Sequence, residues 1–332
     1  MLITRKIIRE SMKFGIVPRE WGYFVEESVE QCILAKRVGF SSIWIEEHHG
    51  NEYYLPSPLP TLAGLSQHVP GMMIGTSIAI LPLYHPVRFA SDGAILDQLS
   101  GGRFIAGVGA GYREHELKLF GIPMSERAGR MDESLIIIAK LWEGEVVNFK
   151  GKYYSLENFR LTPLPIQKPR PQIWVGGWVK QAIERAARLG DAWFPGPSGT
   201  ISFIEENLEF YKECLEKYGK KFNGFPIMRD AYVAVSDDIA VREAEESINY
   251  MYGIDYAKTE HPLLKGKQLN IDEWITDRLL IGSPLTIIEQ IDRLRKMGVN
   301  HLILRLSLRK LSHSKIMESI KLFGEKIIPY FK

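Results

Sequence analysis

A helix followed directly by a strand can be read in residues 86–109, PVRFASDGAILDQLSGGRFIAGVG. Pro86 suits the first turn of a helix, where its missing N–H is not needed, and this helix is predicted to run to Leu99. A strand is predicted from Phe104 to Val108. Strand-like and helix-like segments alternate in the same way along the rest of the chain, which favours parallel β/α units.

The alternation predicts eight strands and two irregular stretches. The strands are predicted at 14–17, 42–45, 73–81, 104–108, 173–175, 192–194, 228–235 and 301–306. The helices are predicted at 24–37, 59–67, 86–99, 127–142, 180–189, 204–218, 284–297 and 316–330. Glu143–Arg170 and Ser247–Asp277 break the pattern and are interpreted as insertions after strands four and seven. The fold class is therefore predicted to be α/β, a (β/α)₈ TIM barrel over residues 12–332, preceded by an extension at 1–11.

The composition indicates a protein with one large core and argues against nucleic-acid binding and membrane insertion. With 332 residues, 45% of them hydrophobic, the chain can bury one large core, and 42 Lys and Arg nearly balance 40 Asp and Glu. No basic stripe for nucleic acid is seen, and no apolar run approaches the ~18–20 residues of a membrane span. Cys32 and Cys214 are expected to be buried free thiols. Because residues 1–11 also lack a signal-peptide pattern, the cytoplasm is expected.

Chemistry in such a barrel is expected at the carboxyl ends of the strands. The second predicted strand ends in Glu46-Glu47-His48-His49, where a histidine could act as general acid or base near neutral pH. The alternative is a solvated loop with ordinary charges. Adjacent histidines on an extended chain point to opposite faces, so His48 and His49 are not expected to chelate together, and no metal is predicted.

Two other strand ends are rich in glycine. Gly107–Tyr112 follows the fourth strand, and the dinucleotide-binding pattern is rejected there because residue 112 is Tyr. Val175-Gly176-Gly177-Trp178 precedes a predicted helix, where free backbone N–H groups could hold an anion, although a plain turn is as good an interpretation. Arg127 could bind a phosphate, or could simply be solvated.

Several blocks in order make the sequence resemble the bacterial luciferase family of flavin-dependent monooxygenases, from Met12 to the C-terminus. The blocks are 44–49 (WIEEHH), 75–82 (GTSIAILP), 85–88 (HPVR), 96–104 (LDQLSGGRF), 120–121, 125–128, 282–284, 319–323 and 329–330. The resemblance implies a barrel that binds reduced FMN from a separate flavin reductase and uses O₂ to oxidise a small organic substrate. A homo-oligomer is also expected.

The resemblance assigns roles to particular positions. His48 occupies the position of the catalytic histidine, Ser77-Ile78 that of a non-proline cis peptide under the flavin, and Arg127 that of a phosphate-binding arginine. The segment Val175, Gly176, Gly177 and Trp178 lies beside the phosphate.

The sequence also departs from the luciferase pattern. Ala110 stands where the family has a second arginine near the phosphate, and Gly177 and Trp178 replace an acidic and a hydroxyl residue. Gly109 stands at the reactive cysteine position, and the aldehyde pocket of the luciferases is not recognisably kept, so light emission is not expected.

Two alternatives stay open. The first is hydride transfer with an 8-hydroxy-5-deazaflavin coenzyme, as in other members of the same superfamily. The Glu47-His48-His49 block favours FMN over this coenzyme. The second is a non-catalytic flavin-binding subunit, against which His48 argues. Ser247–Asp277 mixes tyrosines and Trp274 with charged residues and is predicted to be a mobile lid that excludes water.

Overall fold

The computed structural model describes residues 11–20, 25–50, 55–256, 261–264 and 271–332. The predicted extension at 1–11 therefore lies almost wholly outside the described residues. None of the described helices is long and apolar enough to cross a membrane.

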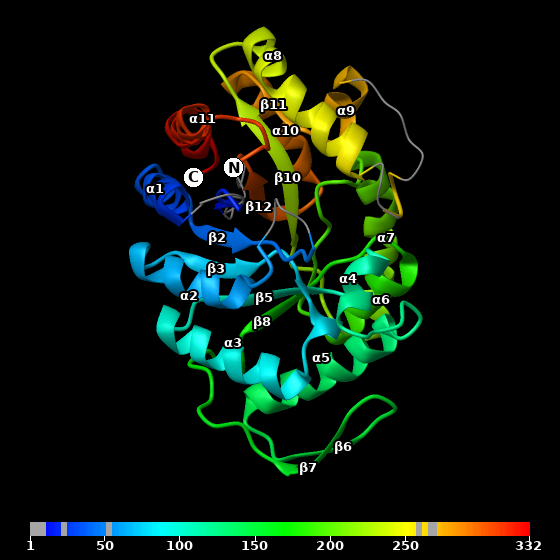
Figure 1. Cartoon of the computed structure of the whole chain (residues 1–332). Coiled ribbons are helices and arrows are strands. Elements are labelled where there is room, and N and C mark those ends of the chain that lie inside the picture. Colours follow the sequence, from blue (N-terminus) through cyan, green and yellow to red (C-terminus); the bar gives the residue numbers. More distant parts are fainter. Residues whose placement is uncertain (1–10, 21–24, 51–54, 257–260, 265–270) are drawn as a thin grey trace, which may run out of the picture.

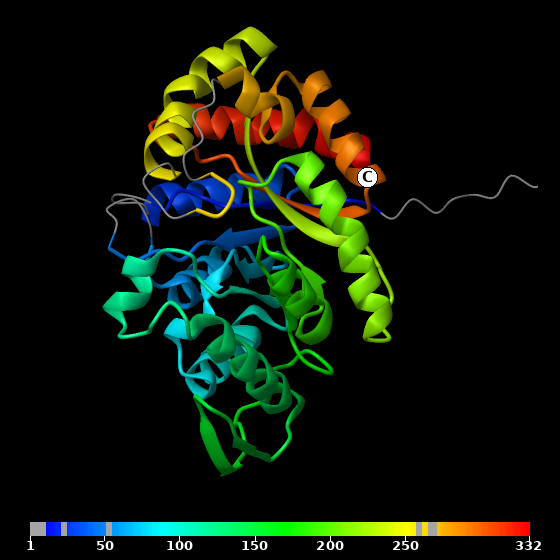
Figure 2. The ribbon, with the colours of Figure 1, turned by 90° about the vertical axis from the view of Figure 1, so that its right-hand side faces the viewer.

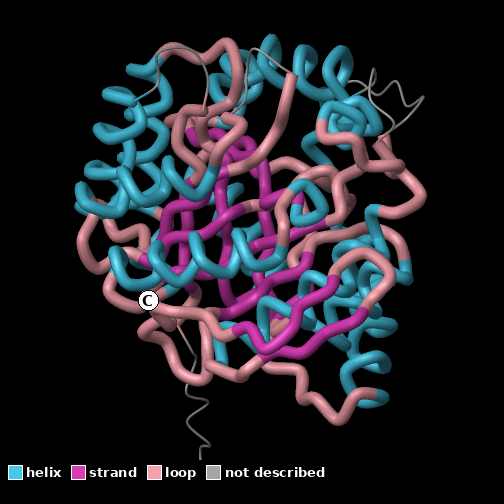
Figure 3. Tube along the Cα trace, turned by 60° about the horizontal axis from the view of Figure 1, so that its bottom comes forward, coloured by secondary structure: helices cyan, strands magenta, loops and turns pink. Residues whose placement is uncertain are grey.

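The main sheet is parallel, and helices surround it (Figures 1 and 3). Its strands are β1 (Lys13–Ile16), β2 (Ser42–Ile45), β3 (Met73–Thr76), β4 (Ala79–Ile80), β5 (Phe104–Gly109), β8 (Gln172–Val175), β9 (Ala192–Trp193), β10 (Phe225–Val233), β11 (Leu280–Gly282) and β12 (Val299–Arg305). Their spatial order is β11-β10-β12-β1-β2-β3-β5-β8-β9, with β4 paired to β5. Just beyond β9, the carbonyl oxygen of Pro195 accepts a hydrogen bond from Met228 N of β10 (3.1 Å), so the curled sheet reaches back toward its other side.

Most helices follow the strands in the predicted alternation, but the helices at 114–119 and 237–248 and the strand β11 were not predicted. The helices are α1 (Val25–Arg37), α2 (Pro58–His68), α3 (Pro86–Ser100), α4 (Glu114–Leu119), α5 (Arg127–Glu143), α6 (Lys180–Leu189), α7 (Ile201–Lys217), α8 (Asp237–Ile248), the π-helix η2 (Asn249–Asp255), α9 (Ile271–Asp277), α10 (Pro284–Lys296) and α11 (His313–Lys326). In α3, the His85 side chain accepts from Val87 N, Pro86 opens the first turn, and Gly101 ends the helix at φ 71°. Only glycine adopts that left-handed conformation without steric cost, so the local sequence sets both ends of this helix.

The interior of the sheet is filled with side chains at alternate positions of each strand. Trp44 stacks on Trp174 at 4.8 Å between ring centroids, and the His301 ring packs edge-on against both. Ser42 Oγ accepts a hydrogen bond from Nε1 of Trp44 (2.8 Å) and is hydrogen-bonded to Nε2 of His301 (2.7 Å). Burial lowers the pKa of His301 to about 3, so this ring is neutral at physiological pH. These residues form a closed floor beneath the carboxyl ends of the strands.

The stretch 143–170 leaves the sheet, as predicted. Its strands β6 (Val147–Lys150) and β7 (Ser155–Phe159) pair only with each other, as an antiparallel hairpin that projects from one end of the molecule (Figure 2). Cys32 and Cys214 are buried and free, which confirms the prediction.

The strand predicted at 228–235 runs instead from Phe225 to Val233, and two further elements differ in extent for a local reason. The strand predicted at 73–81 is divided into β3 and β4 by a cis peptide bond between Ser77 and Ile78, and a short 3₁₀ turn, η1 (Leu81–Leu83), follows. The last helix ends at Lys326, and the chain continues as a 3₁₀ turn, η4 (Ile328–Phe331). Pro329 has no N–H to continue the α-helical hydrogen bonds, which accounts for the change.

Candidate functional site

A cavity of about 250 Å³ opens at the carboxyl ends of the strands, above the floor of packed rings. Eight of the nine predicted site residues line it: His48, Ser77, Ile78, Ala110, Arg127, Gly176, Gly177 and Trp178. Val175 does not. Its side chain is fully buried, and a Cβ placed on Gly190 would meet it at 2.9 Å, so Val175 faces the end of α6.

His48 is held in one orientation by a carboxylate from α4. Its Nδ1 lies 2.8 Å from Oε1 of Glu116, a residue that the sequence reasoning missed. Burial and the nearby charge of Arg113 lower the pKa of His48, while Glu116 opposes that shift. A neutral His48 that donates its Nδ1 hydrogen to Glu116 carries its lone pair on Nε2, which is the arrangement of a general base.

The predicted cis peptide bond at Ser77-Ile78 is present. It places the Ile78 side chain against two glycines of neighbouring strands. A Cβ on Gly109 would lie 2.9 Å from Ile78 Cδ1, and one on Gly176 would lie 3.3 Å from Ile78 Cγ2. Larger residues at these two positions would displace Ile78 from the cavity wall. Ser77 Oγ is buried in the same wall and has no hydrogen-bond partner among the described residues.

Glu47 supports the chain just beyond this bond. Its carboxylate accepts hydrogen bonds from Ile80 N (2.6 Å) and from the Tyr84 hydroxyl (2.9 Å), and it lies 2.8 Å from Nε2 of His49. Burial raises the pKa of Glu47, and these hydrogen bonds oppose the shift. The Glu47 carboxylate thus fixes the backbone at Ile80 and holds the ring of His49.

A buried ionic cluster lies at the bottom of the cavity. Arg305, at the end of β12, donates to both carboxylate oxygens of Glu46 at 3.1 Å and to Asp230 at 2.9 Å. It also donates to the Tyr256 hydroxyl at 3.1 Å. The two carboxylates hold the pKa of Arg305 well above its usual value in spite of burial, and burial beside Glu46 raises that of Glu20. The cluster is a fixed charged layer directly above the apolar floor.

The cavity lining also contains groups that can hold a phosphate. Arg127 donates from Nε to Gly111 O (3.2 Å) and from Nη1 to Met124 O (2.7 Å), which orients its guanidinium. Arg185, which the sequence reasoning missed, also lines the cavity and pairs with Asp132. These cations stand beside the glycine-rich turn that leads into α6.

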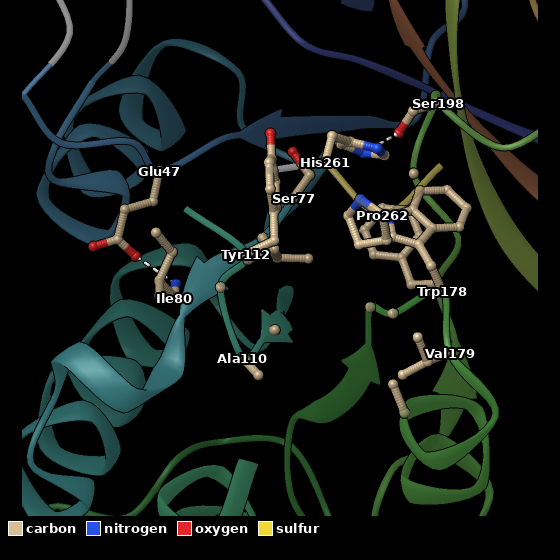
Figure 4. Close-up of a pocket in the computed structure, with 18 of the residues that line it drawn as sticks. Glu47, Ser77, Ile80, Ala110, Tyr112, Trp178, Val179, Ser198, His261 and Pro262 are labelled. Carbon is tan, nitrogen blue, oxygen red and sulfur yellow. Dashed lines mark hydrogen bonds between the residues drawn. The ribbon is translucent and has the colours of Figure 1, made fainter. Parts of the chain in front are cut away.

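Aromatic side chains and part of the predicted lid close the top of the cavity (Figure 4). His261 packs edge-on against Tyr112 at 4.9 Å and lies 6.2 Å from the ring of Trp178. In the predicted lid, Tyr252 and Trp274 are buried, as expected for a cover that is apolar inside. Residues 257–260 and 265–270 of that lid lie outside the described residues, and its movement stays a prediction.

The architecture agrees with the comparisons to known proteins. The family model for luciferase-like monooxygenases matches residues 23–301. The chain belongs to this family.

Relatives within the luciferase-like family differ in cofactor. The oxygenase component of flavin-dependent trigonelline monooxygenase from Acinetobacter baylyi is 27% identical, over 73% of this chain and 68% of that protein. An F420-dependent glucose-6-phosphate dehydrogenase from Amycolatopsis mediterranei is 26% identical, over 83% of this chain and 86% of the dehydrogenase. The crystal structure of monooxygenase RslO1 from Streptomyces bottropensis superposes with a TM-score of 0.85 at 23% identity, covering 97% of this chain and all of the other. At that identity the superposition shows the fold alone.

Proposed function

We propose that this chain is the oxygenase of an FMN-dependent monooxygenase, which accepts reduced FMN from a separate flavin reductase and oxidises a small organic substrate with O₂. The observation that carries the proposal is His48, held by Glu116 at 2.8 Å, in a cavity that Arg127 and Arg185 also line. When bound, reduced FMN supplies the electrons that activate O₂.

The residues present fit a flavin. Arg127 and the backbone N–H groups of 176–178 would hold the phosphate, and Arg185 would add a second cation that compensates for Ala110. The Ile78 side chain, which packs on Gly109 and Gly176, would support the flat flavin ring. Ser77 Oγ, which has no hydrogen-bond partner among the described residues, would bond to the polar edge of that ring. His48 would accept or return a proton at Nε2.

The second candidate is hydride transfer with an 8-hydroxy-5-deazaflavin coenzyme. It is favoured by the dehydrogenase relatives, which cover more of this chain than the trigonelline monooxygenase does, 83% against 73%. The Glu47-His48-His49 block supports FMN, because the deazaflavin relatives more often carry Asp-His at this corner. A non-catalytic subunit would not need the His48–Glu116 pair.

The deciding experiment is an anaerobic titration of the purified protein with reduced FMN and, separately, with the reduced deazaflavin. We expect saturable binding of FMN and binding of the deazaflavin that is weaker by roughly tenfold or more, the equivalent of one well-placed contact. Tighter binding of the deazaflavin would transfer the assignment to the second candidate. Stopped-flow mixing of the reduced complex with O₂ then tests whether bound FMN reacts.

Four structural and cellular features belong to the same proposal. They are a closed (β/α)₈ barrel, supported by the Met228–Pro195 hydrogen bond, a single domain at 12–332, a homo-oligomer and a cytoplasmic location.

A further inference from the structure

The chain that joins β3 to β4 contains one residue more than the strand beside it. Gly75 is opposite Ile105. Ala79, four residues later, is opposite Val108, which comes only three residues later on β5. An extra residue of this kind is a β-bulge, which interrupts the ladder and redirects side chains. Adjacent residues of a regular strand point to opposite faces, yet both residues of Ser77-Ile78 line the cavity.

Two side chains hold the ends of this bulge. On the side of β5, Thr76 Oγ1 donates to the carbonyl oxygen of Gly107 (2.6 Å). On the side of β2, the Glu47 carboxylate accepts a hydrogen bond from Ile80 N (2.6 Å; Figure 4). Glu47 therefore spans the distance from the end of β2 to β4 and holds the chain in place just after the bulge.

The contacts of Glu47 depend on the length of its side chain more than on its charge. The buried carboxylate meets a backbone N–H, the hydroxyl of Tyr84 (2.9 Å) and Nε2 of His49 (2.8 Å). Among the described residues, no lysine or arginine forms an ion pair with it. An amide of the same length could serve these partners too. Its oxygen accepts from Ile80 N, and its NH₂ group donates to the Tyr84 oxygen or to a ring nitrogen of His49 that carries no hydrogen.

We propose that Glu47 is a positioning residue for the ring end of the cofactor and that it acts through its length. Its carboxylate sets the point at which the chain rejoins β5 after the bulge. It thereby sets where Ser77 Oγ and the Ile78 side chain stand in the cavity wall. This inference rests on the proposed function, because it takes the cavity to bind a flavin. FMN and riboflavin share the same ring, so an effect at the ring end must be equal for the two molecules.

The test compares Glu47→Asp with Glu47→Gln. Aspartate keeps the charge but is shorter by one methylene, about 1.5 Å, whereas glutamine keeps the length and loses the charge. Both variants are titrated anaerobically with reduced FMN and with reduced riboflavin. We expect Glu47→Asp to weaken the binding of both molecules by the same factor, roughly tenfold, which corresponds to one hydrogen bond lost at the ring. Glu47→Gln should bind both nearly as tightly as the wild type.

Glu133→Asp is the matched control. Glu133 accepts hydrogen bonds from the backbone N–H groups of residues 152, 153 and 154, at 2.6, 3.0 and 3.0 Å, so it also holds a chain segment in place through its length. It is not among the residues that line the cavity. Glu133→Asp should therefore leave both flavin affinities unchanged. If a general loss of stability were the cause of the Glu47→Asp effect, Glu133→Asp would weaken flavin binding as well.

The position of the chain can be measured without any flavin. Hydrogen exchange at the Ile80 amide is followed by NMR on protein that contains isotope-labelled isoleucine. Exchange should be roughly tenfold or more faster in Glu47→Asp, because the Ile80 N–H loses its acceptor, and it should stay at the wild-type rate in Glu47→Gln. Equal exchange rates in wild type and Glu47→Asp would overturn the positioning role.

The titrations can also overturn the proposal. A greater loss of affinity in Glu47→Gln than in Glu47→Asp would mean that Glu47 acts through its charge. A loss for FMN alone would mean that it acts on the phosphate, as expected of Arg127→Ala. Wild-type affinity of Glu47→Asp for both molecules would mean that the length of the side chain has no influence on the ring end.

Two further outcomes have a defined meaning. If Glu47→Asp does not fold, Tyr84→Phe replaces it, since this variant removes one of the hydrogen bonds that hold the carboxylate. Tyr84→Phe should weaken the binding of FMN and riboflavin by an equal, smaller factor, and unchanged affinities would overturn the proposal. If the wild-type protein binds neither flavin, the proposed function fails, and hydrogen exchange at Ile80 then decides the positioning role by itself.

Discussion

Two regions follow one another along the strands of this protein. Buried packing residues lie within the strands, and charged or reactive side chains lie just beyond them, toward the carboxyl ends. On β2 and its extension, Trp44 lies in the apolar floor, Glu46 in the ionic cluster and His48 in the cavity, each two residues after the last. On β12, His301 belongs to the floor and Arg305 to the cluster. Because side chains alternate in a strand, all of these face inward. A rigid, dry layer therefore sits directly beneath charged groups, and it fixes the backbone that carries them.

The largest effect is expected in the cavity, at His48. His48→Ala should keep the fold and most of the FMN affinity but lower turnover by roughly 10²–10⁴-fold, the usual contribution of a general acid or base. Turnover is measured with a verified substrate, and His115→Ala, an exposed histidine beside Glu116, is the matched control. Equal turnover in the two variants would contradict the assignment.

The pH profile of turnover sharpens this prediction. A base acts only while it is unprotonated, and burial lowers the pKa of His48 below its ordinary value of 6.5. Activity should therefore persist below pH 6.5 before it declines. Because the Glu116 carboxylate raises the pKa of His48, Glu116→Gln should move the acidic limb to still lower pH, whereas a merely structural role would leave the limb in place.

The second largest effect is expected in the ionic cluster, and it concerns the free energy of unfolding instead of turnover. Arg305→Met leaves Glu46 and Asp230 buried without their cation, which should cost about 3–5 kcal/mol in the free energy of unfolding. Urea denaturation measures this cost. Arg88→Met breaks an ion pair in which the arginine is exposed, and it should leave the urea midpoint unchanged. Equal midpoints for the two variants would mean that the cluster contributes no more than a surface pair.

At the phosphate end the expected effect is on affinity. Arg127→Ala should weaken FMN binding by about 1.5–3 kcal/mol, the value of a hydrogen bond to a charged group, and should leave riboflavin binding nearly unchanged. Arg130→Ala removes the same charge one turn later in α5, where Arg130 pairs with Glu126, and serves as the control. If Arg127→Ala still prefers FMN to riboflavin by the wild-type factor, another group holds the phosphate.

The sequence was sufficient for the residues that belong to regular strands. His48 could be predicted because it follows a clear strand, and Ser77-Ile78 because the block around it is specific to the family. The outward direction of the Val175 side chain could also have been predicted, since Trp174 and Gly176 face inward and side chains alternate along a strand.

The partners of these residues could not be predicted, because the fold brings them from distant segments. Glu116 lies in the six-residue helix α4, which is too short for a periodic pattern, and meets His48 across 68 positions. Arg185 looks like an ordinary charged residue of an amphipathic helix until α6 is placed at the cavity. Ser198 and His261 lie in separate loops and become a pair only in the folded chain.

The smallest effect is expected in the floor. At neutral pH, His301→Gln should lower the free energy of unfolding by about 1 kcal/mol, because it perturbs one hydrogen bond, to Ser42.

The pH dependence of the free energy of unfolding is more informative. His301 has a pKa of about 3 in the folded protein and an ordinary value of 6.5 when unfolded, so below pH 6.5 the unfolded chain binds a proton that the native protein does not. Wild-type stability should therefore fall as pH decreases from 6.5 toward 3. His261 has the same shift and adds a second proton, so His301→Gln should remove only part of the slope, on the order of 1 kcal/mol per pH unit. Urea denaturation between pH 7.5 and 5 measures this slope, with the exposed His115→Gln as control, and identical slopes in wild type and His301→Gln would show that the floor histidine does not stay neutral.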